Sequence, residues 1–475
     1  MSNAREARPE VRTAAVAVLL AAGMVFLSCG GSSSSSATAM APLPANVTTV
    51  QVNLGDAPSD WIMAFGMTVN SITLTNSGGG TVNMVPTASP MELMQAMATV
   101  MPISSVAVPQ GTYTQAMVTF SAVSMGYMDP VSHTYKQKTL AGPFTATVPF
   151  TPAMTVGASS MALNFDMNMG SSVSIDASGT VSLTPMMTAS MGATAGTGMN
   201  PWQGTMQHQV GTASSLSGSR FALGSMMGMQ QTTLMTNAST QFMGTGFTGM
   251  GSMTTGMLVA VDAALQSDGT YLAQRVESMG AGVSGMMGGG VVTAITGNPP
   301  TQLTLVANAG QGGGMMASSI AGTLTVAIPA STPYIIDANG VDLTGLPFMP
   351  TFGPSTLSKG QRVEVVSGSG MMGGGMMGGS GSLTASQVRL EQQGLHGVVS
   401  AYVTNGSQTS FTLTLPADSA FTSLTGATAI QVYKQAGTQL RNLNAIANTN
   451  EVMVRGLLFN DAGTYRLAAS WIVAP

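Results

Sequence analysis

The residues that could carry out chemistry are few and scattered along the sequence. The 475-residue chain has three histidines, His133, His208 and His396, and one cysteine, Cys29. No Gly-Xaa-Ser-Xaa-Gly, Walker or His-Glu-Xaa-Xaa-His motif occurs in the sequence. Because the histidines fall in different segments, we expect each to flank a strand or lie on the surface. The sequence predicts no catalytic residue and no cofactor, and therefore a non-enzymatic protein.

One pair of carboxylates could bind a metal ion. Asp56 and Asp60 flank Ala57, Pro58 and Ser59, and Ca²⁺ could use both carboxylates together with carbonyl oxygens of the turn. An Asp before Ala-Pro is also a turn former whose carboxylate accepts nearby backbone amides. A hydrolase based on either Asp would require that carboxylate to lie in a cleft with a second titratable group.

Methionine is the unusual residue of this chain, with 41 copies beside 59 glycines. Thioether sulfur favours Cu(I), so clusters of methionine on glycine loops indicate Cu(I) binding or oxidant scavenging as an alternative function. Compositional drift also explains the clusters, because other methionines stand in strand-like segments where they replace Leu as gap fillers. The candidate Cu(I) ligands are Met226, Met227, Met229, Met371, Met372, Met376 and Met377, and the candidate gap fillers are Met63, Met67, Met84 and Met117.

Composition excludes several classes of protein. Only 7% of the residues are charged and the net charge is -4, so the chain lacks the basic surface that nucleic-acid binding requires. Its 44% hydrophobic content is too high for ordinary disorder. No run of about 18 apolar residues is present, which excludes a polytopic membrane protein.

The N-terminus predicts export. Arg5, Arg8 and Arg12 precede an apolar run at residues 14–27, a pattern typical of a signal peptide over residues 1–28. The Ser/Gly-rich segment at residues 29–46 then reads as a flexible tether.

The position of Cys29 after the apolar run resembles the lipobox of bacterial lipoproteins. That resemblance implies a lipidated Cys29 that anchors the chain in the lipid bilayer, at the outer membrane or cell surface of a bacterium. Phe26 and Leu27 depart from the usual lipobox residues, so cleavage by an ordinary signal peptidase near Ala39 or Ala41 stays open as an alternative.

Residues 47–195 predict a β-sandwich, because strand-like segments alternate with Gly, Pro and Asp turns. One short helix is expected near residues 90–99, where Ser89, Pro90 and Glu92 form a capping-box pattern. Residues 50–60, 67–74 and 108–115 resemble, in order and spacing, the bacterial secreted family named domain of unknown function 4382. Membership in that family implies a β-sandwich at the cell surface and no established reaction.

The remainder of the chain contains an internal repeat. Each unit opens with a Gly- and Val-containing strand, at residues 209–211, 290–292 and 397–399, and closes with a strand, a hairpin turn and a strand. The repeat resembles the small β-barrel family named domain of unknown function 5666. We therefore expect an all-β chain in which the sandwich is followed by about three OB-like barrels, at residues 199–280, 288–392 and 394–475.

These observations together predict a lipid-anchored envelope protein whose β domains serve surface display or interaction. The expected partners are the bilayer, through Cys29, and an unidentified envelope or extracellular molecule. Nucleic acid is not expected as a partner.

Overall fold

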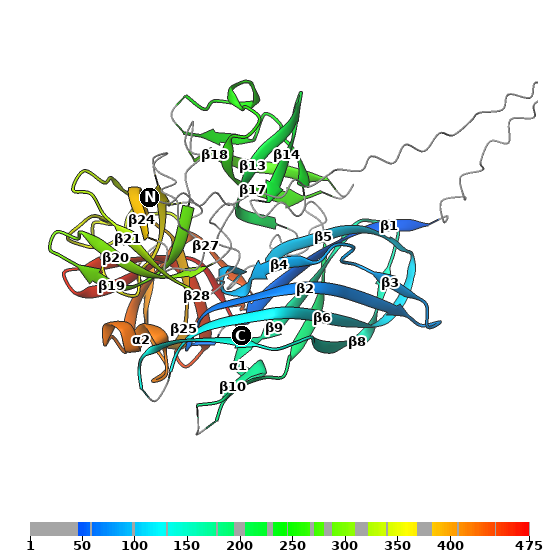
Figure 1. The fold of residues 1–475 in the computed structure, drawn as a ribbon, viewed down its shortest axis with the longest axis horizontal. Coiled ribbons are helices and arrows are strands. Elements are labelled where there is room, and N and C mark those ends of the chain that lie inside the picture. The colour runs from blue at the N-terminus through cyan, green and yellow to red at the C-terminus, as the bar shows by residue number, and fades with distance from the viewer. Residues whose placement is uncertain are drawn as a thin grey trace, which may run out of the picture. The chain divides into compact units, whose positions relative to one another are not determined.

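The computed structural model describes most of the chain from residue 46 to residue 474. Outside the described residues lie 1–45, 58, 97–99, 130–131, 177–178, 194–204, 226–230, 245, 267–269, 280–286, 309–321, 339–340, 368–381, 406–407, 442 and 475. Strands make up most of the described part, and helices are short (Figure 1). The prediction of an all-β fold is confirmed.

The N-terminal domain consists mainly of two β-sheets. The first has the order β12 (Met187–Ala193), β9 (Met161–Asn168), β1 (Val47–Ala57) and β5 (Val100–Pro109). The second has the order β3 (Thr81–Asn83), β2 (Ile62–Asn76), β6 (Gly111–Met128) and β7 (Tyr135–Leu140), with β4 (Ser89–Glu92) on β2 and β8 (Phe144–Val156) on β6. A one-turn helix α1 (Met169–Ser172) and the small hairpin β10 (Val173–Ile175) and β11 (Val181–Leu183) complete the domain.

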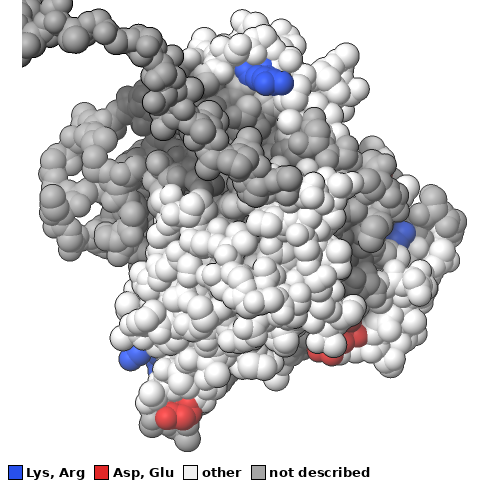
Figure 2. All heavy atoms as spheres, turned by 90° about the vertical axis from the view of Figure 1, so that its right-hand side faces the viewer, with Lys and Arg blue, Asp and Glu red and all other residues white. Residues whose placement is uncertain are grey.

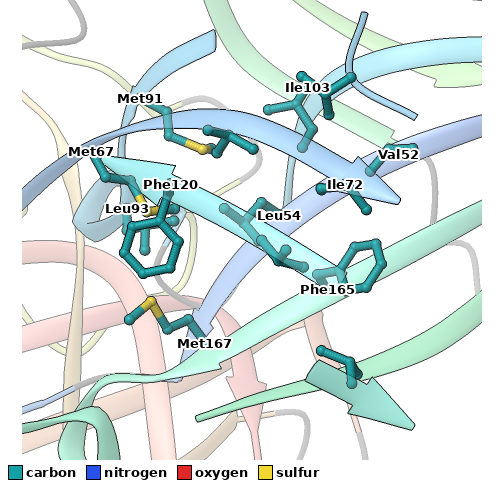
Figure 3. Packing of buried hydrophobic residues seen from close by; sticks show 14 of the residues in the cluster. Val52, Leu54, Met67, Ile72, Met91, Leu93, Ile103, Phe120, Phe165 and Met167 are labelled. Atoms are coloured by element: carbon teal, nitrogen blue, oxygen red, sulfur yellow. The ribbon is translucent and has the colours of Figure 1, made fainter. Parts of the chain in front are cut away.

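The core of this domain lies between the two sheets. Leu54 and Phe165 from one sheet and Met67, Ile72 and Phe120 from the other belong to a single buried cluster (Figure 3). Alternation along the strands produces this core, because successive side chains of a strand point to opposite faces. The domain is therefore a β-sandwich, as predicted.

The methionines of the sandwich differ in their surroundings. Met63, Met67 and Met84 are buried and fill the interior as Leu would. Met117 lies between the buried Ala116 and Val118 in β6, so its side chain points outward and is 43% exposed. The gap-filler interpretation therefore holds for the first three and fails for Met117.

The helix expected near residues 90–99 is present only as a single 3₁₀ turn, η1 (Leu93–Ala96). Its expected capping box is wrong, because Ser89–Glu92 form strand β4 and pair with β2 at Gly66–Val69. Oε1 of Glu92 accepts the backbone N–H of Phe65 at 2.8 Å and that of Met94 at 3.2 Å. The carboxylate thus serves a neighbouring strand and the 3₁₀ turn instead of a helix N-cap.

Three successive regions of the described chain each form a closed ring of strands with the same order. In each ring the first strand lies between the second and the fourth, and the third strand pairs in parallel with the fifth. This is the small closed barrel expected for an OB-like domain. The first barrel contains β13 (Thr205–Ser217), β14 (Arg220–Ser225), β15 (Gln231–Met235), β17 (Leu258–Leu265) and β18 (Tyr271–Ser278), with β16 (Gln241–Met243) and the 3₁₀ turn η2 (Met250–Ser252) as additions.

The second and third barrels repeat that arrangement. The second contains β19 (Met287–Thr296), β20 (Gln302–Asn308), β21 (Thr323–Ala327), β23 (Arg362–Ser367) and β24 (Ser382–Leu390), with β22 (Tyr334–Ile336) beside β24. The third contains β25 (Gln392–Asn405), β26 (Gln408–Thr414), β27 (Ala429–Arg441), β28 (Glu451–Asp461) and β29 (Thr464–Val473), with the short helix α2 (Ala420–Thr425) between β26 and β27.

The glycines that open the repeats permit a close approach of two strands. A Cβ on Gly211 would lie 2.4 Å from the carbonyl oxygen of Gly224, and one on Gly397 would lie 2.3 Å from that of Thr414. Both contacts join the first strand of a barrel to the second. Glycine is therefore required where the first strand crosses the second most closely.

The domains also share buried apolar contacts. Val366 of the second barrel packs with Val210, Leu258 and Met279 of the first, and Leu390 packs with Leu457, Phe459 and Ala468 of the third. The described part of the chain beyond Asn46 is one compact unit, so the barrels are not a string of separate modules. Figure 2 shows one face, on which charged side chains are few. Among the described residues, no helix has the length and apolarity needed to cross a membrane.

Candidate functional site

Asp60 lies where the sandwich contacts the third barrel. It stands in the turn between β1 and β2, and its Oδ2 lies 2.9 Å from Nδ1 of His396 in β25. Its backbone oxygen accepts the N–H of Ala420, the first residue of α2, at 2.7 Å. Asp56 is the second-last residue of β1 and pairs with Met167, and its side chain lies outside the described part of the structure.

His396 is held between two carboxylates. Its Nε2 lies 3.1 Å from Oε1 of Glu451, on the side opposite Asp60. The hydrogen bond to Asp60 raises the pKa of His396, and the charges of both acids add to that effect, although burial opposes it. Protonated imidazole donates from both nitrogens, so the pair of carboxylates selects the cationic form.

A second histidine joins the same two domains. Nδ1 of His133, in the loop between β6 and β7, lies 3.2 Å from Oγ of Ser423 in α2. Behind these polar contacts Met63 and Met128 of the sandwich share a buried cluster with Ala420. We call Asp60, His133, His396, Glu451 and Ser423 the histidine junction. The expectation that histidines merely flank strands missed this role, since partners in different domains leave no spacing signal.

A cavity of about 80 Å³ adjoins the histidine junction and is lined by Asp60, His396, Arg362 and Arg455. Burial lowers the pKa of Arg455 to about 10, with a contribution from the charge of Arg362, while Glu391 opposes the decrease. Asp60 thus meets the condition set for a hydrolase, a cleft with a second titratable group. Because both imidazole nitrogens already face carboxylates, His396 has no nitrogen left to remove a proton from a nucleophile.

A second group of charges lies between the first and second barrels, and we call it the arginine junction. Nη2 of Arg389, in β24, lies 2.6 Å from Oε1 of Glu277 in β18 and 3.7 Å from Oδ2 of Asp337. Nε of Arg389 lies 3.9 Å from Oε2 of Glu364 in β23. Arg275 binds the other oxygen of Glu277 at 2.9 Å. Burial lowers the pKa of Arg389, but the surrounding carboxylates outweigh that effect and raise it.

Glu364 is the most isolated acid of the arginine junction. It is fully buried, and neither carboxylate oxygen has a hydrogen-bond partner among the described residues. Burial raises its pKa to about 7, with Arg389 acting in the opposite direction. Strand β23 alternates charged and apolar residues in the order Arg362, Val363, Glu364 and Val365. This alternation places the charged side chains on a buried outer face of the barrel, and a sequence search for alternating charged and apolar residues could have found it.

Another cavity measures about 390 Å³ and lies between the sandwich and the first barrel. One wall is the segment Met101–Ser105 of β5, the end strand of its sheet. The facing wall comes from the second and third strands of the barrel, through Arg220 and Leu223 of β14 and Gln231–Thr233 of β15. Tyr271 of β18 closes one side. We call this space the sandwich–barrel cavity.

The walls of the sandwich–barrel cavity are polar but almost uncharged. Gln51, Gln209 and Gln231 supply amides, and Ser105 and Thr232 are among the hydroxyl-bearing residues. Thioethers and aliphatic groups fill the intervening surface. Such a mixture of apolar surface and a few hydrogen-bonding groups is characteristic of pockets for small ligands, which often lie at domain interfaces.

Two sets of predicted residues lie outside the described residues. They are Cys29 and the seven candidate Cu(I) ligands, Met226, Met227, Met229, Met371, Met372, Met376 and Met377. Cu(I) binding by those methionines stays a prediction, and titration of Cu(I) into the chain and into a variant with Met371, Met372, Met376 and Met377 changed to Leu would test it. Within the described ranges, no group of three or more His, Cys, Asp or Glu residues is arranged to hold a metal ion.

Comparison with known proteins bears on the first barrel. Residues 210–277 match the family described as Domain of unknown function (DUF5666). The match extends from β13 to β18 and therefore includes the strands that form the first ring. No curated protein matches the chain. The first repeat of the chain is thus similar to the DUF5666 family, as the sequence resemblance implied.

Proposed function

We propose that the chain is a non-enzymatic, lipid-anchored protein of the bacterial cell envelope whose β domains bind another molecule. In this proposal the sandwich is a member of the domain of unknown function 4382 family, and Cys29 carries the lipid. The partner is an envelope or extracellular molecule and is not a nucleic acid.

The observation that carries the binding role is the sandwich–barrel cavity. Its volume of about 390 Å³ is within the usual range for small-ligand pockets. Its described walls contain hydrogen-bonding amides and hydroxyls but no histidine, Asp or Glu that could act as a general base. Walls of this composition support recognition of a ligand in preference to its chemical conversion.

The N-terminal pattern supports the location. Three arginines, an apolar run and a single cysteine two positions after that run are what an exported lipoprotein needs. Multiple acyl chains on one residue would anchor the protein firmly, because a single chain gives only marginal binding. The Ser/Gly tether would then separate the folded domains from the bilayer.

Metabolic labelling with a palmitate analogue tests this proposal. We expect the wild-type chain to be labelled and to sediment with membranes, and Cys29→Ala to lose the label and appear in the soluble extracytoplasmic fraction or remain as the precursor. Equal labelling of both chains would contradict lipidation. Retention of the wild-type chain in the cytoplasm would contradict export.

A further inference from the structure

We propose that the sandwich–barrel cavity binds a small ligand with one carboxylate on an uncharged polar body, and that Arg220 recognises the carboxylate. This inference specifies the ligand of the proposed binding function. It depends on the cavity and not on Cys29, so the labelling experiment and the binding experiment below can fail independently.

The first argument is the charge of the cavity. Among the described residues that line it, Arg220 is the only charged side chain. A guanidinium remains protonated at all physiological pH values. The described walls therefore carry one positive charge, which disfavours cationic ligands and favours a singly charged anion.

The second argument is that Arg220 is available for a ligand. Arg275, Arg389 and Arg466 each pair with a carboxylate. Arg362 and Arg455 also have interactions within the chain. Of the arginine side chains that the structure describes, Arg220 alone has neither a hydrogen bond nor an ion pair with a described residue. In a chain with only 14 Lys and Arg residues, a guanidinium without a described partner beside the sandwich–barrel cavity is a distinctive feature.

The third argument is the geometry of the walls. Arg220 begins β14 and pairs with Met235 at the end of β15, so a carboxylate held by its side chain would lie toward that end of the barrel wall. A guanidinium can donate two parallel hydrogen bonds to a carboxylate, which fixes the direction of the ligand. The body of the ligand would then extend along Gln231–Thr233 and the facing β5 segment, whose amides and hydroxyls suit peptide or sugar groups.

Strand edges beside the cavity could bind an extended ligand. In the described structure β5 is the end strand of its sheet, and β15 pairs with β18 only at Leu234 and Met235. Among the described residues, the backbone of Gln231–Thr233 pairs with β14. Backbone groups at such an edge can bind an extended ligand. Two ligands share the required chemistry: the C-terminal residues of a peptide and an acidic oligosaccharide.

Binding of matched probes to the purified full chain tests the proposal. The peptide probes are acetyl-Thr-Gly-Ala with a free carboxylate and the same tripeptide as its C-terminal amide. The sugar probes are a disaccharide ending in glucuronic acid and its neutral glucose counterpart. Saturation-transfer NMR and competition titrations would measure the dissociation constants.

We expect at least one carboxylate probe to bind and its neutral counterpart to bind at least about tenfold more weakly. Binding of the peptide acid alone would identify a C-terminal peptide as the ligand type, and binding of the glucuronate alone would identify an acidic sugar. Failure of both carboxylate probes to bind, or equal binding of charged and neutral probes, would overturn the proposal.

Two variants place the binding at the cavity. Arg220→Gln should weaken carboxylate binding by about tenfold or more, a loss corresponding to about 1.4 kcal/mol, and Ser105→Trp should block the cavity from the sandwich side. Lys138→Gln is the matched control, because Lys138 is an exposed cation in β7 that does not line the cavity. Equal losses in Arg220→Gln and Lys138→Gln, or wild-type binding by Arg220→Gln, would overturn the assignment to Arg220.

Discussion

The two charged junctions of this molecule join domains in different ways. The arginine junction joins the first and second barrels through a cation that stays charged at every physiological pH, surrounded by Glu277, Asp337 and Glu364. The histidine junction joins the sandwich to the third barrel through an imidazole whose charge depends on pH. A chain with 7% charged residues therefore concentrates several of its charges between domains, but only one junction has a titratable cation.

The two junctions differ in how deeply their charged groups are buried. Removing the cation from the arginine junction would leave buried carboxylates without compensation, which is costly in a medium of low polarity. The histidine junction is more exposed, with Glu451 at 61% side-chain exposure, so water can replace part of its interactions. We expect the first junction to dominate stability and the second to dominate the response to pH at the domain contact.

The largest effect is expected for Arg389→Met. This change removes the cation that Glu277, Asp337 and Glu364 share, although Arg275 stays beside Glu277 and the charge of Arg362 still acts on Glu364. Loss of one partner of a buried ion pair costs about 3–5 kcal/mol. Urea unfolding at pH 7.5 should show an earlier transition for the first two barrels. Lys136→Met, which removes the exposed partner of Asp129, should change the unfolding curve far less. Equal effects of the two changes would contradict the importance of the arginine junction.

The second largest effect on the free energy of unfolding is expected for Glu364→Gln. Because burial raises the pKa of Glu364 to about 7 from an ordinary 4.5, the folded protein binds an extra proton between those pH values. Stability from this group is complete below pH 4.5 and is lost as the pH rises through about 7. The variant should be about 1–3 kcal/mol more stable than the wild type at pH 8, the cost of an unsatisfied buried group.

The control for this prediction is the pH profile itself. Free energies of unfolding measured from pH 5 to pH 8.5 should fall less steeply for Glu364→Gln than for the wild type. Parallel profiles would show that Glu364 stays ionised throughout, held by Arg389.

A smaller effect is expected for His396→Gln. The pKa of His396 is raised in the folded state, chiefly by Asp60, so its contribution is present below its unfolded pKa of about 6.5 and is lost as the pH rises through the folded value. The variant should lose on the order of 1 kcal/mol at pH 5.5, after solvent screening, and little at pH 9. If the loss of stability were the same at every pH, His396 would contribute through its packing and not through its charge. The double variant with Glu364→Gln should show additive effects, since the junctions share no residue.

The smallest effect is expected for Ser423→Ala. The hydrogen bond between His133 and Ser423 is exposed, and surface changes of this kind usually alter stability by about 0.5 kcal/mol or less. Hydrogen exchange of α2 should increase slightly while the third barrel stays protected. Loss of protection throughout that barrel would show that His133 contributes more to the histidine junction than its exposure indicates.

The fold was predictable where its determinants are local. The Gly- and Val-containing openings of the repeats predicted the strands in which Gly211 and Gly397 permit close packing. Local reasoning failed at Ser89–Glu92, because the capping-box pattern also fits a strand whose Glu92 carboxylate accepts the amide of Phe65 on a neighbouring strand. Pattern rules cannot weigh that long-range hydrogen bond against a local cap.

The candidate sites were predictable only in part for the same reason. Asp60 is recognisable from its turn, but its partner His396 is 336 residues away, and neither residue's neighbours indicate the other. Arg220 is the first basic residue after Lys138, a feature of the sequence alone. Its place beside the sandwich–barrel cavity emerges only when β14 and β5 are brought together.

The long separation between Asp60 and His396 has a consequence for biogenesis. A chain made from its N-terminus completes the sandwich long before α2 exists. The part of the Met63 and Met128 surface that Ala420 covers is therefore buried late, although Val306 of the second barrel joins the same cluster earlier. A chain truncated before the third barrel would leave the part of that surface covered by Ala420 exposed to chaperones and proteases. The contact of the third barrel with the sandwich therefore couples the protection of an early-made surface to the folding of a segment made much later.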